Sequence, residues 1–145
     1  MSPASSAAPK RFYVDTSAYL CILLGEEGSD ELSAEMADAE MCSSVLLVLE
    51  ARRNLVRLAR EGTLSPDQYQ NCAGRSREDQ TRFILRDLTL DLCESPQIPP
   101  VTTPRSLDLA HLRTALWFHA EATLTRFVTM DAGQRHAAHD LGLPV

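Results

Sequence analysis

One short stretch near the N-terminus limits the folds open to this chain more than any other. Residues 11–14, Arg-Phe-Tyr-Val, lack the polar–apolar alternation of a half-exposed strand and run directly into Asp15, Thr16 and Ser17. Such a run is typical of a strand buried on both faces, as in a parallel sheet covered by helices. Ligands of open α/β sheets bind at the carboxyl ends of these strands. We therefore expect Asp15 to lie at a ligand-binding edge.

The same pattern returns near the C-terminus, where the apolar run that begins at Arg126 ends on Asp131. Between the two runs, apolar segments alternate with stretches of helical spacing. Strands alternating with helices predict a three-layer α/β/α sandwich with a central parallel sheet of four to five strands. Beside the two runs, further strands are expected at 41–43, 88–92 and 143–145. Helices are expected at 18–24, 26–40, 45–61, from 67 into the eighties, from 106 and at 134–140. A proline-rich loop is expected at 95–104.

The composition predicts an ordinary globular protein. With 145 residues, 44% of them hydrophobic, we expect one domain over residues 11–145. Residues 1–10 are rich in Ser, Ala and Pro without the apolar segment of a signal peptide, so we expect a disordered tail. The cysteines form no C-x-x-C pair, which disfavours a zinc or redox motif and favours reduced thiols in the cytoplasm. No segment approaches the ~18 apolar residues of a membrane span.

The charged residues exclude several classes of protein. A net charge of −6 argues against an indiscriminate nucleic-acid binder, but not against an enzyme that reaches a phosphate chain through metal ions. Lys10 is the only lysine, which excludes a P-loop. Receiver domains and haloacid-dehalogenase-like phosphatases also complete their sites with a lysine. The phosphatases need a second acid two residues after the first, where this chain has Ser17.

Four acids stand apart from the surface acids by their settings. Asp15 and Asp131 each end an apolar strand, and the alternative to a shared site is that each only caps the following helix. Glu50 interrupts the apolar start of its helix, so it needs a metal ion or an ion-pair partner, with Arg53 as the alternative partner. Asp108 follows an expected helix cap at Ser106, and the alternative is a favourable acid in the first turn.

Together these four carboxylates would repel one another unless cations neutralised them. Carboxylate-only ligation suits a hard ion, Mg²⁺ or Mn²⁺. Such an ion polarises a phosphodiester and lowers the pKa of an attacking water. We therefore predict phosphodiester hydrolysis, with Asp15, Glu50, Asp108 and Asp131 as catalytic and metal-binding residues.

Several segments, taken in order, resemble the PIN-domain ribonucleases, and most closely the VapC-type toxins of bacterial toxin–antitoxin pairs. The resemblance covers nearly all of residues 11–145 and is carried by residues 13–17, 43–55, 105–116, 127–131 and 141–145. It implies an endoribonuclease dependent on Mg²⁺ or Mn²⁺, a homodimer, and a cognate antitoxin whose C-terminal segment occupies the toxin groove. The four acids match the family's acidic site, and Thr16 or Ser17 and Thr129 match the hydroxyl positions beside it. Arg113, where the family has a small residue, and the short, proline-rich 88–104 region depart from the pattern and affect substrate choice.

Other side chains carry weaker predictions. Arg52, Arg53 and Arg113 are candidates for binding RNA phosphates, since arginine binds phosphate bidentately, with salt bridges to nearby acids as the alternative. His111 is expected to be packed or hydrogen-bonded and not to act as a general base. The rival to the enzyme is a non-catalytic PIN-like module that binds RNA or a protein.

Overall fold

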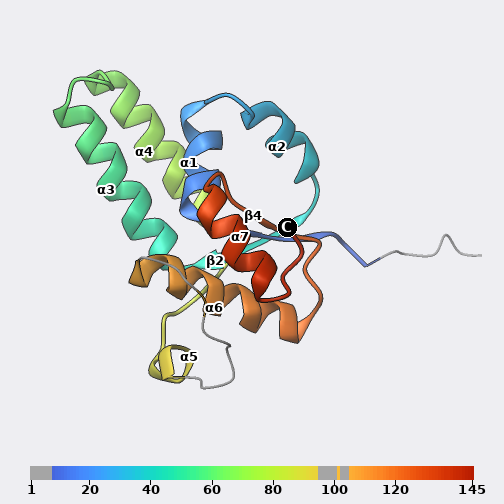
Figure 1. Ribbon diagram of the computed structural model, residues 1–145. Coiled ribbons are helices and arrows are strands. Elements are labelled where there is room, and N and C mark those ends of the chain that lie inside the picture. The colour runs from blue at the N-terminus through green and yellow to red at the C-terminus, as the bar shows by residue number, and fades with distance from the viewer. Residues whose placement is uncertain (1–7, 95–100, 102–104) are drawn as a thin grey trace, which may run out of the picture.

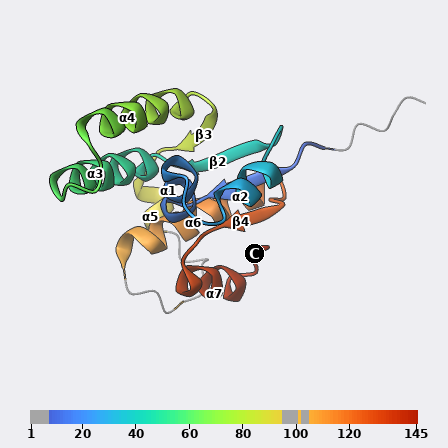
Figure 2. The same ribbon diagram turned by 90° about the horizontal axis from the view of Figure 1, so that it is seen from above.

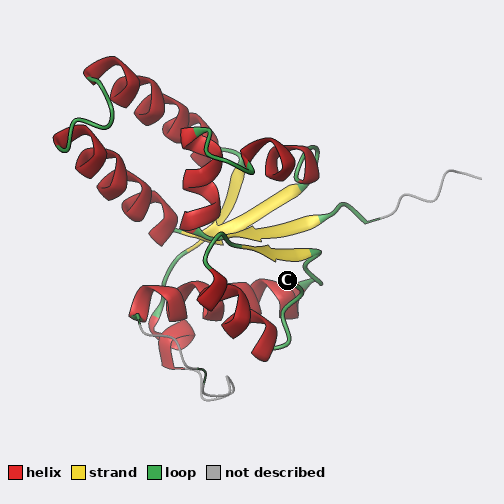
Figure 3. Cartoon of the chain, turned by 45° about the horizontal axis from the view of Figure 1, so that its top comes forward, coloured by secondary structure: helices red, strands yellow, loops and turns green. Residues whose placement is uncertain are grey.

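Four parallel strands form the centre of the protein. The computed structural model describes residues 8–94, 101 and 105–145. Within them the strands are β1 (Arg11–Val14), β2 (Glu40–Ser44), β3 (Phe83–Arg86) and β4 (Arg126–Val128), arranged in the order β3-β2-β1-β4. Figure 3 shows the strands side by side in one sheet. All three neighbouring pairs are parallel. The prediction of an α/β protein with a central parallel sheet is confirmed.

Helices cover both faces of this sheet, as the two ribbon views show (Figures 1 and 2). Phe12 and Val14 of β1 pack into one apolar cluster, and Tyr13 between them packs into the other. The first cluster takes its helical residues from α1 (Thr16–Leu24), α2 (Ser29–Glu35), α3 (Leu46–Arg60) and α4 (Pro66–Gln80). The second takes them from α6 (Ser106–Glu121) and α7 (Ala132–Asp140). The alternating burial of β1 on two sides explains its unbroken apolar sequence.

Several helix ends follow from local chemistry. Asp15 caps α1 at its start, and Gly25 ends it with a φ of 64°, a left-handed conformation that glycine adopts without strain. Ser65 and Gln68 form a reciprocal capping box at the start of α4, with Pro66 as its first residue. These boundaries agree with the sequence-based expectations.

Two predicted elements in the interior of the chain differ from the structure. The strand expected at 88–92 is wrong, because β3 lies earlier, at Phe83–Arg86, where it pairs with β2. Residues Leu90–Glu94 instead form a short helix, α5, which begins beside a hydrogen bond between the side chains of Thr89 and Asp91. The helix expected at 26–40 is shorter, since only Ser29–Glu35 is helical.

The end of the chain also departs from expectation. Residues 143–145 form no strand, although the Phe127 N–H donates to the Pro144 carbonyl at 2.7 Å. Most of the expected loop at 95–104 and of the expected tail at 1–10 lies outside the described residues. Within the described ranges, no helix is both long enough and apolar enough to cross a membrane.

Candidate functional site

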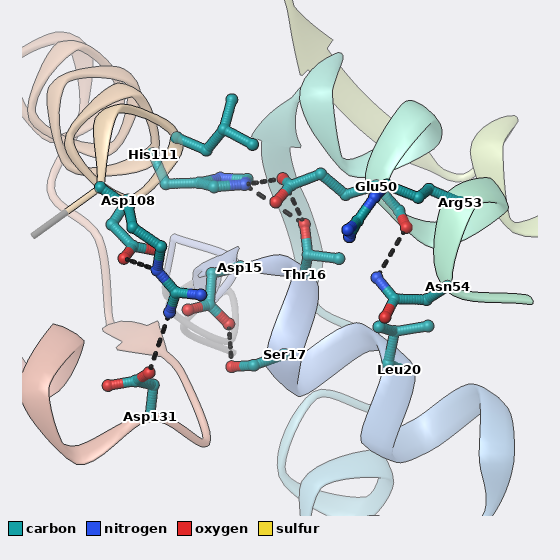
Figure 4. A pocket seen from close by; sticks show the side chains of 12 residues that line it. Asp15, Thr16, Ser17, Leu20, Glu50, Arg53, Asn54, Asp108, His111 and Asp131 are labelled. Carbon is teal, nitrogen blue, oxygen red and sulfur yellow. Dashed lines mark hydrogen bonds and ion pairs between the residues drawn. The ribbon is translucent and has the colours of Figure 1, made fainter. Parts of the chain in front are cut away.

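A pocket of about 480 Å³ opens at the carboxyl edge of the sheet, and all four singled-out acids line it (Figure 4). Asp15 follows β1, Glu50 lies in α3, Asp108 is in the first turn of α6, and Asp131 follows β4. Four elements distant in the sequence therefore contribute one carboxylate each. We call this cavity the carboxylate pocket.

Asp15 is both a helix cap and part of the pocket wall. Its Oδ1 accepts hydrogen bonds from the Ala18 N–H at 3.1 Å and the Ser17 hydroxyl at 2.7 Å. Only 5% of the residue is exposed, and this burial raises the pKa of Asp15, against the opposing effect of hydrogen bonds from Thr129, Ser17 and the Ala18 backbone. The two explanations for this aspartate are thus compatible, and the residue holds a desolvated carboxyl in the pocket.

The side-chain partners of Glu50 are His111 and Thr16, and not Arg53, the alternative ion-pair partner considered above. Its Oε1 lies 2.7 Å from His111 Nε2 and accepts a hydrogen bond of 2.8 Å from the Thr16 hydroxyl. Burial favours a higher pKa for Glu50, but the interactions with His111, Thr16 and Arg105 outweigh it and lower the pKa. Among the described contacts, no salt bridge joins Glu50 to Arg53.

His111 is fixed from both sides. Its Nδ1 lies 2.7 Å from the Tyr13 hydroxyl, and its Nε2 faces Glu50. An ionised carboxylate only accepts hydrogen bonds, so Nε2 carries a proton directed at Glu50. The ring is 3% exposed. His111 is therefore a buried, hydrogen-bonded residue, as expected, and its position fixes one oxygen of Glu50.

Asp108 and Asp131 share a different partner, Arg105. Arg105 Nε lies 3.0 Å from Asp108 Oδ2, and its Nη2 lies 3.8 Å from Asp131 Oδ2. Arg105, not Ser106, is the residue before the first turn of α6, and no side chain caps this helix. The predicted cap at Ser106 is wrong because α6 starts at Ser106 itself. The placement of Asp108 in the first turn is confirmed.

Backbone and amide contacts of Gln134 connect the end of β4 with α6. Asp131 Oδ1 caps α7 by accepting from the Gln134 N–H at 2.9 Å, and Gln134 Nε2 donates to the Asp108 carbonyl at 2.8 Å. Gln134 is buried and thereby ties the segments that carry Asp108 and Asp131 to each other. The packing of α7 against α6 brings this glutamine into the site, and sequence reasoning missed it.

The predicted hydroxyl residues link the ends of β1 and β4. The hydroxyls of Ser17 and Thr129 lie 3.2 Å apart. The Met130 N–H donates to Ser17 Oγ at 3.0 Å, and the Asp131 N–H donates to Thr129 Oγ1 at 3.1 Å. Thr16 instead donates its hydroxyl hydrogen bond to Glu50. These hydroxyls hold the carboxylate-bearing turns in place.

The predicted RNA-binding arginines separate in space. Arg53 is among the described residues that line the carboxylate pocket, whereas Arg52 and Arg113 are not. Arg52 borders a cavity between α3 and α4, and Arg113 donates to the Leu92 carbonyl of α5 at 3.3 Å. Arg105 does line the pocket, although sequence reasoning did not single it out. Its spacing of three residues before Asp108 was the available signal.

The donor chemistry of the pocket fits a hard divalent ion, but the side-chain positions do not close around one. Among the described residues, four carboxylates and no sulfur ligand line it, which suits Mg²⁺ or Mn²⁺. As the side chains lie, no group of three or more metal-ligating residues within the described ranges stands close enough to hold an ion. Two of the acids are paired with Arg105, so binding of an ion by all four requires these pairs to open.

Comparison with known proteins adds no family assignment. A scan against protein-family models finds no match to the chain, and a search of curated proteins finds no significant match. The protein has an α/β fold with a four-stranded parallel sheet flanked by helices.

Proposed function

We propose that this protein is an endoribonuclease of the PIN-domain type, dependent on Mg²⁺ or Mn²⁺. The observation that carries the proposal is the meeting of Asp15, Glu50, Asp108 and Asp131, from four separate elements, in one pocket at the carboxyl edge of a parallel sheet. Four negative charges in such a space need cations to neutralise them. Hydrolysis of a phosphodiester is the chemistry that such a charged site suits best.

The four carboxylates would hold the ion or ions. When bound, a divalent ion would supply positive charge against the phosphate and lower the pKa of an attacking water. Glu50 and Asp15 are fixed for this role by His111, Thr16 and Ser17, each through hydrogen bonds of 2.8 Å or less. Because these two carboxylates are held in position before any ligand arrives, little reorganisation is needed on that side of the pocket.

The wall of the pocket also offers groups for RNA. Arg53 and Asn54 of α3 line it beside Glu50. Arginine donates in a planar fork that matches phosphate oxygens. With a net charge of −6, the protein lacks a general attraction for nucleic acid, so RNA contacts would concentrate at this local cluster and at the metal.

We extend the proposal to the biological role that the resemblance implies, the toxin of a toxin–antitoxin pair acting as a homodimer in the cytoplasm. The segments that carry the resemblance, 13–17, 105–116 and 127–131, include three of the four pocket acids, and 43–55 includes the fourth. Expression of the wild type should then arrest bacterial growth, and Asp15→Asn should not. Co-expression of a small protein encoded directly upstream should restore growth. Unimpaired growth with the wild type would contradict the toxin role.

One observation favours a second candidate, a non-catalytic PIN-like module that binds RNA or a protein. In the part of the chain that the structure describes, the pocket acids are satisfied by internal partners and form no ready metal cluster. A binding module needs no more than this. The two candidates differ in whether RNA is cut.

The deciding experiment is RNA cleavage in Mg²⁺ or Mn²⁺ by the wild type, Asp15→Asn and Asp108→Asn. We expect each variant to lose roughly 100-fold or more in rate, since even residues that only support metal ligands typically account for 10- to 100-fold. Asp67→Asn is a matched control, because Asp67 is an exposed acid in the first turn of α4. Undiminished cleavage by the two pocket variants would overturn the proposal. RNA bound but never cut, with or without metal, would establish the binding module.

A further inference from the structure

Arg105 is the cation that two of the pocket acids share. Its guanidinium contacts Asp108 on α6 through Nε and Asp131, the cap of α7, through Nη2. The dashed lines from Asp108 and Asp131 in Figure 4 mark these two ion pairs. Both pairs use the Oδ2 atom of the aspartate. A divalent ion bound by Asp108 and Asp131 would need these same carboxylates.

The other arginine of the pocket is placed differently. Arg53 also lines the pocket, but among the described contacts it forms no ion pair with any of the four acids. The positive charge of Arg105 reaches further, since it also lowers the pKa of Glu50. Arg105 is thus the side chain that offsets the negative charge on the Asp108 side of the pocket.

The ion pairs of Arg105 are easy to open. The side chain is 69% exposed, and exposed pairs of this kind contribute only about 0–1 kcal/mol. Its backbone has an extended conformation, with φ −130° and ψ 140°, directly before α6. Displacement from the carboxylates would therefore leave the guanidinium tethered at the pocket, three residues from Asp108, with its donors available to an anion.

We propose that Arg105 is an exchangeable counter-ion: it neutralises Asp108 and Asp131 in the metal-free protein, gives way to the divalent ion, and then binds a phosphate of the RNA. This inference rests on the proposed function. It assigns to one residue two opposite effects, weakening metal binding and strengthening substrate binding. A purely structural side chain would not have both.

The test measures metal and RNA separately. Mn²⁺ is titrated calorimetrically into the wild type, Arg105→Gln and the matched control Arg53→Gln, which removes the same charge from the same pocket without breaking an ion pair. We expect Arg105→Gln to bind Mn²⁺ about 2- to 5-fold more tightly, the range that an exposed ion pair supplies, and Arg53→Gln to change less. At saturating Mn²⁺, Arg105→Gln should raise the KM for RNA about 10-fold, with Arg105→Lys intermediate.

Each result has a distinct meaning. Unchanged Mn²⁺ affinity in Arg105→Gln, or an equal gain in Arg53→Gln, would overturn the counter-ion role. Tighter Mn²⁺ binding with an unchanged KM would overturn the phosphate role. If the wild type binds Mn²⁺ but cuts no RNA, the proposed function fails, and the Mn²⁺ titrations still decide whether Arg105 competes with the ion. An unchanged melting temperature of Arg105→Gln without metal would show that the fold is intact.

Discussion

The two halves of the carboxylate pocket are built in different ways. The inner half consists of Asp15 and Glu50, whose hydrogen-bond partners include the buried side chains of Thr16 and His111. The outer half consists of Asp108 and Asp131, which share the exposed Arg105. The inner half is held by partners in the buried core, and the outer half is held by an exposed arginine whose contacts solvent already screens.

This difference assigns two requirements of a metal site, fixed ligand positions and room to accept an ion, to two different halves of the pocket. Carboxylates whose partners are buried keep their geometry, because packing and hydrogen bonds fix those partners. Carboxylates paired with an exposed side chain can change partner at little cost. We infer that the inner half provides the fixed geometry of the site and that the outer half completes it when a cation arrives.

The largest expected effect comes from removing the buried partner of the inner half. His111→Leu leaves the Glu50 carboxylate without its hydrogen bond to the histidine while keeping an apolar side chain in the core, and should lower the free energy of unfolding by about 3 kcal/mol. Arg105→Gln, in the outer half, should change it by less than about 1 kcal/mol. Urea denaturation measures both. Adding Glu50→Gln to His111→Leu should recover part of the loss in stability. Equal losses in His111→Leu and Arg105→Gln would contradict the difference between the inner and outer halves.

The second effect is stabilisation by metal. Mn²⁺ at about 100 times its Kd should stabilise the wild type by about 2.7 kcal/mol through binding to the folded state alone. Glu50→Gln loses one carboxylate of the inner half and should show a smaller rise in melting temperature at the same concentration. Thermal unfolding with and without Mn²⁺ measures this. Equal rises in both proteins would remove Glu50 from the metal site.

The third prediction concerns pH and Asp15. Because burial raises the pKa of Asp15 above its ordinary value of 3.8, the folded state holds this proton more tightly than the unfolded state. The free energy of unfolding therefore falls as pH rises from the unfolded pKa through the folded one, and stays lower above it. Asp15→Asn keeps the cap and should be more stable than the metal-free wild type at neutral pH.

The control for this prediction is the acid range, where Asp15 is protonated in both states and the two proteins should converge. Urea denaturation along a pH series tests it. If Asp15→Asn is less stable than the wild type at neutral pH, the ionised carboxylate stabilises the fold, as an ordinary helix cap does. Burial of Asp15 would then not destabilise the folded state.

The smallest expected effect comes from an exposed ion pair outside the pocket, which serves as a reference for the strength of the Arg105 pairs. Arg126 binds Glu35 of α2 through two hydrogen bonds of 2.7 Å, and this pairing lowers the pKa of Glu35. The pair therefore stabilises the fold above the unfolded pKa of Glu35, and its contribution is lost as pH falls through the folded pKa. Glu35→Gln should cost about 0.2–1 kcal/mol at neutral pH by urea denaturation. A loss well above that of Arg105→Gln would show that the Arg105 pairs are even weaker than this exposed pair.

The sequence was sufficient to predict the convergence of the strand-end aspartates. Asp15 and Asp131 end apolar runs, and parallel strands of one sheet end at the same edge, so the fold class placed them together. The strand at Phe83–Arg86 was missed because a short apolar run at the end of a helix has no period that separates it from the helix.

The partners of the acids were harder to predict for a physical reason. Helical spacing identifies neighbours within one helix, which is why Arg53 was considered for Glu50. The actual partner, His111, is 61 residues away and reaches Glu50 only because α6 packs on the sheet. Hydrogen bonds between packed elements leave no periodic signal in the sequence. The partners of the pocket acids could therefore be identified only from the structure.

The most direct test of the four-carboxylate metal site is anomalous diffraction from crystals of the wild type grown with Mn²⁺. We predict a peak in the carboxylate pocket, with oxygens of the inner half and of Asp108 or Asp131 bound to the ion, and with the Arg105 guanidinium moved away from those aspartates. A pocket without a peak at saturating Mn²⁺, with Arg105 still between Asp108 and Asp131, would contradict the account.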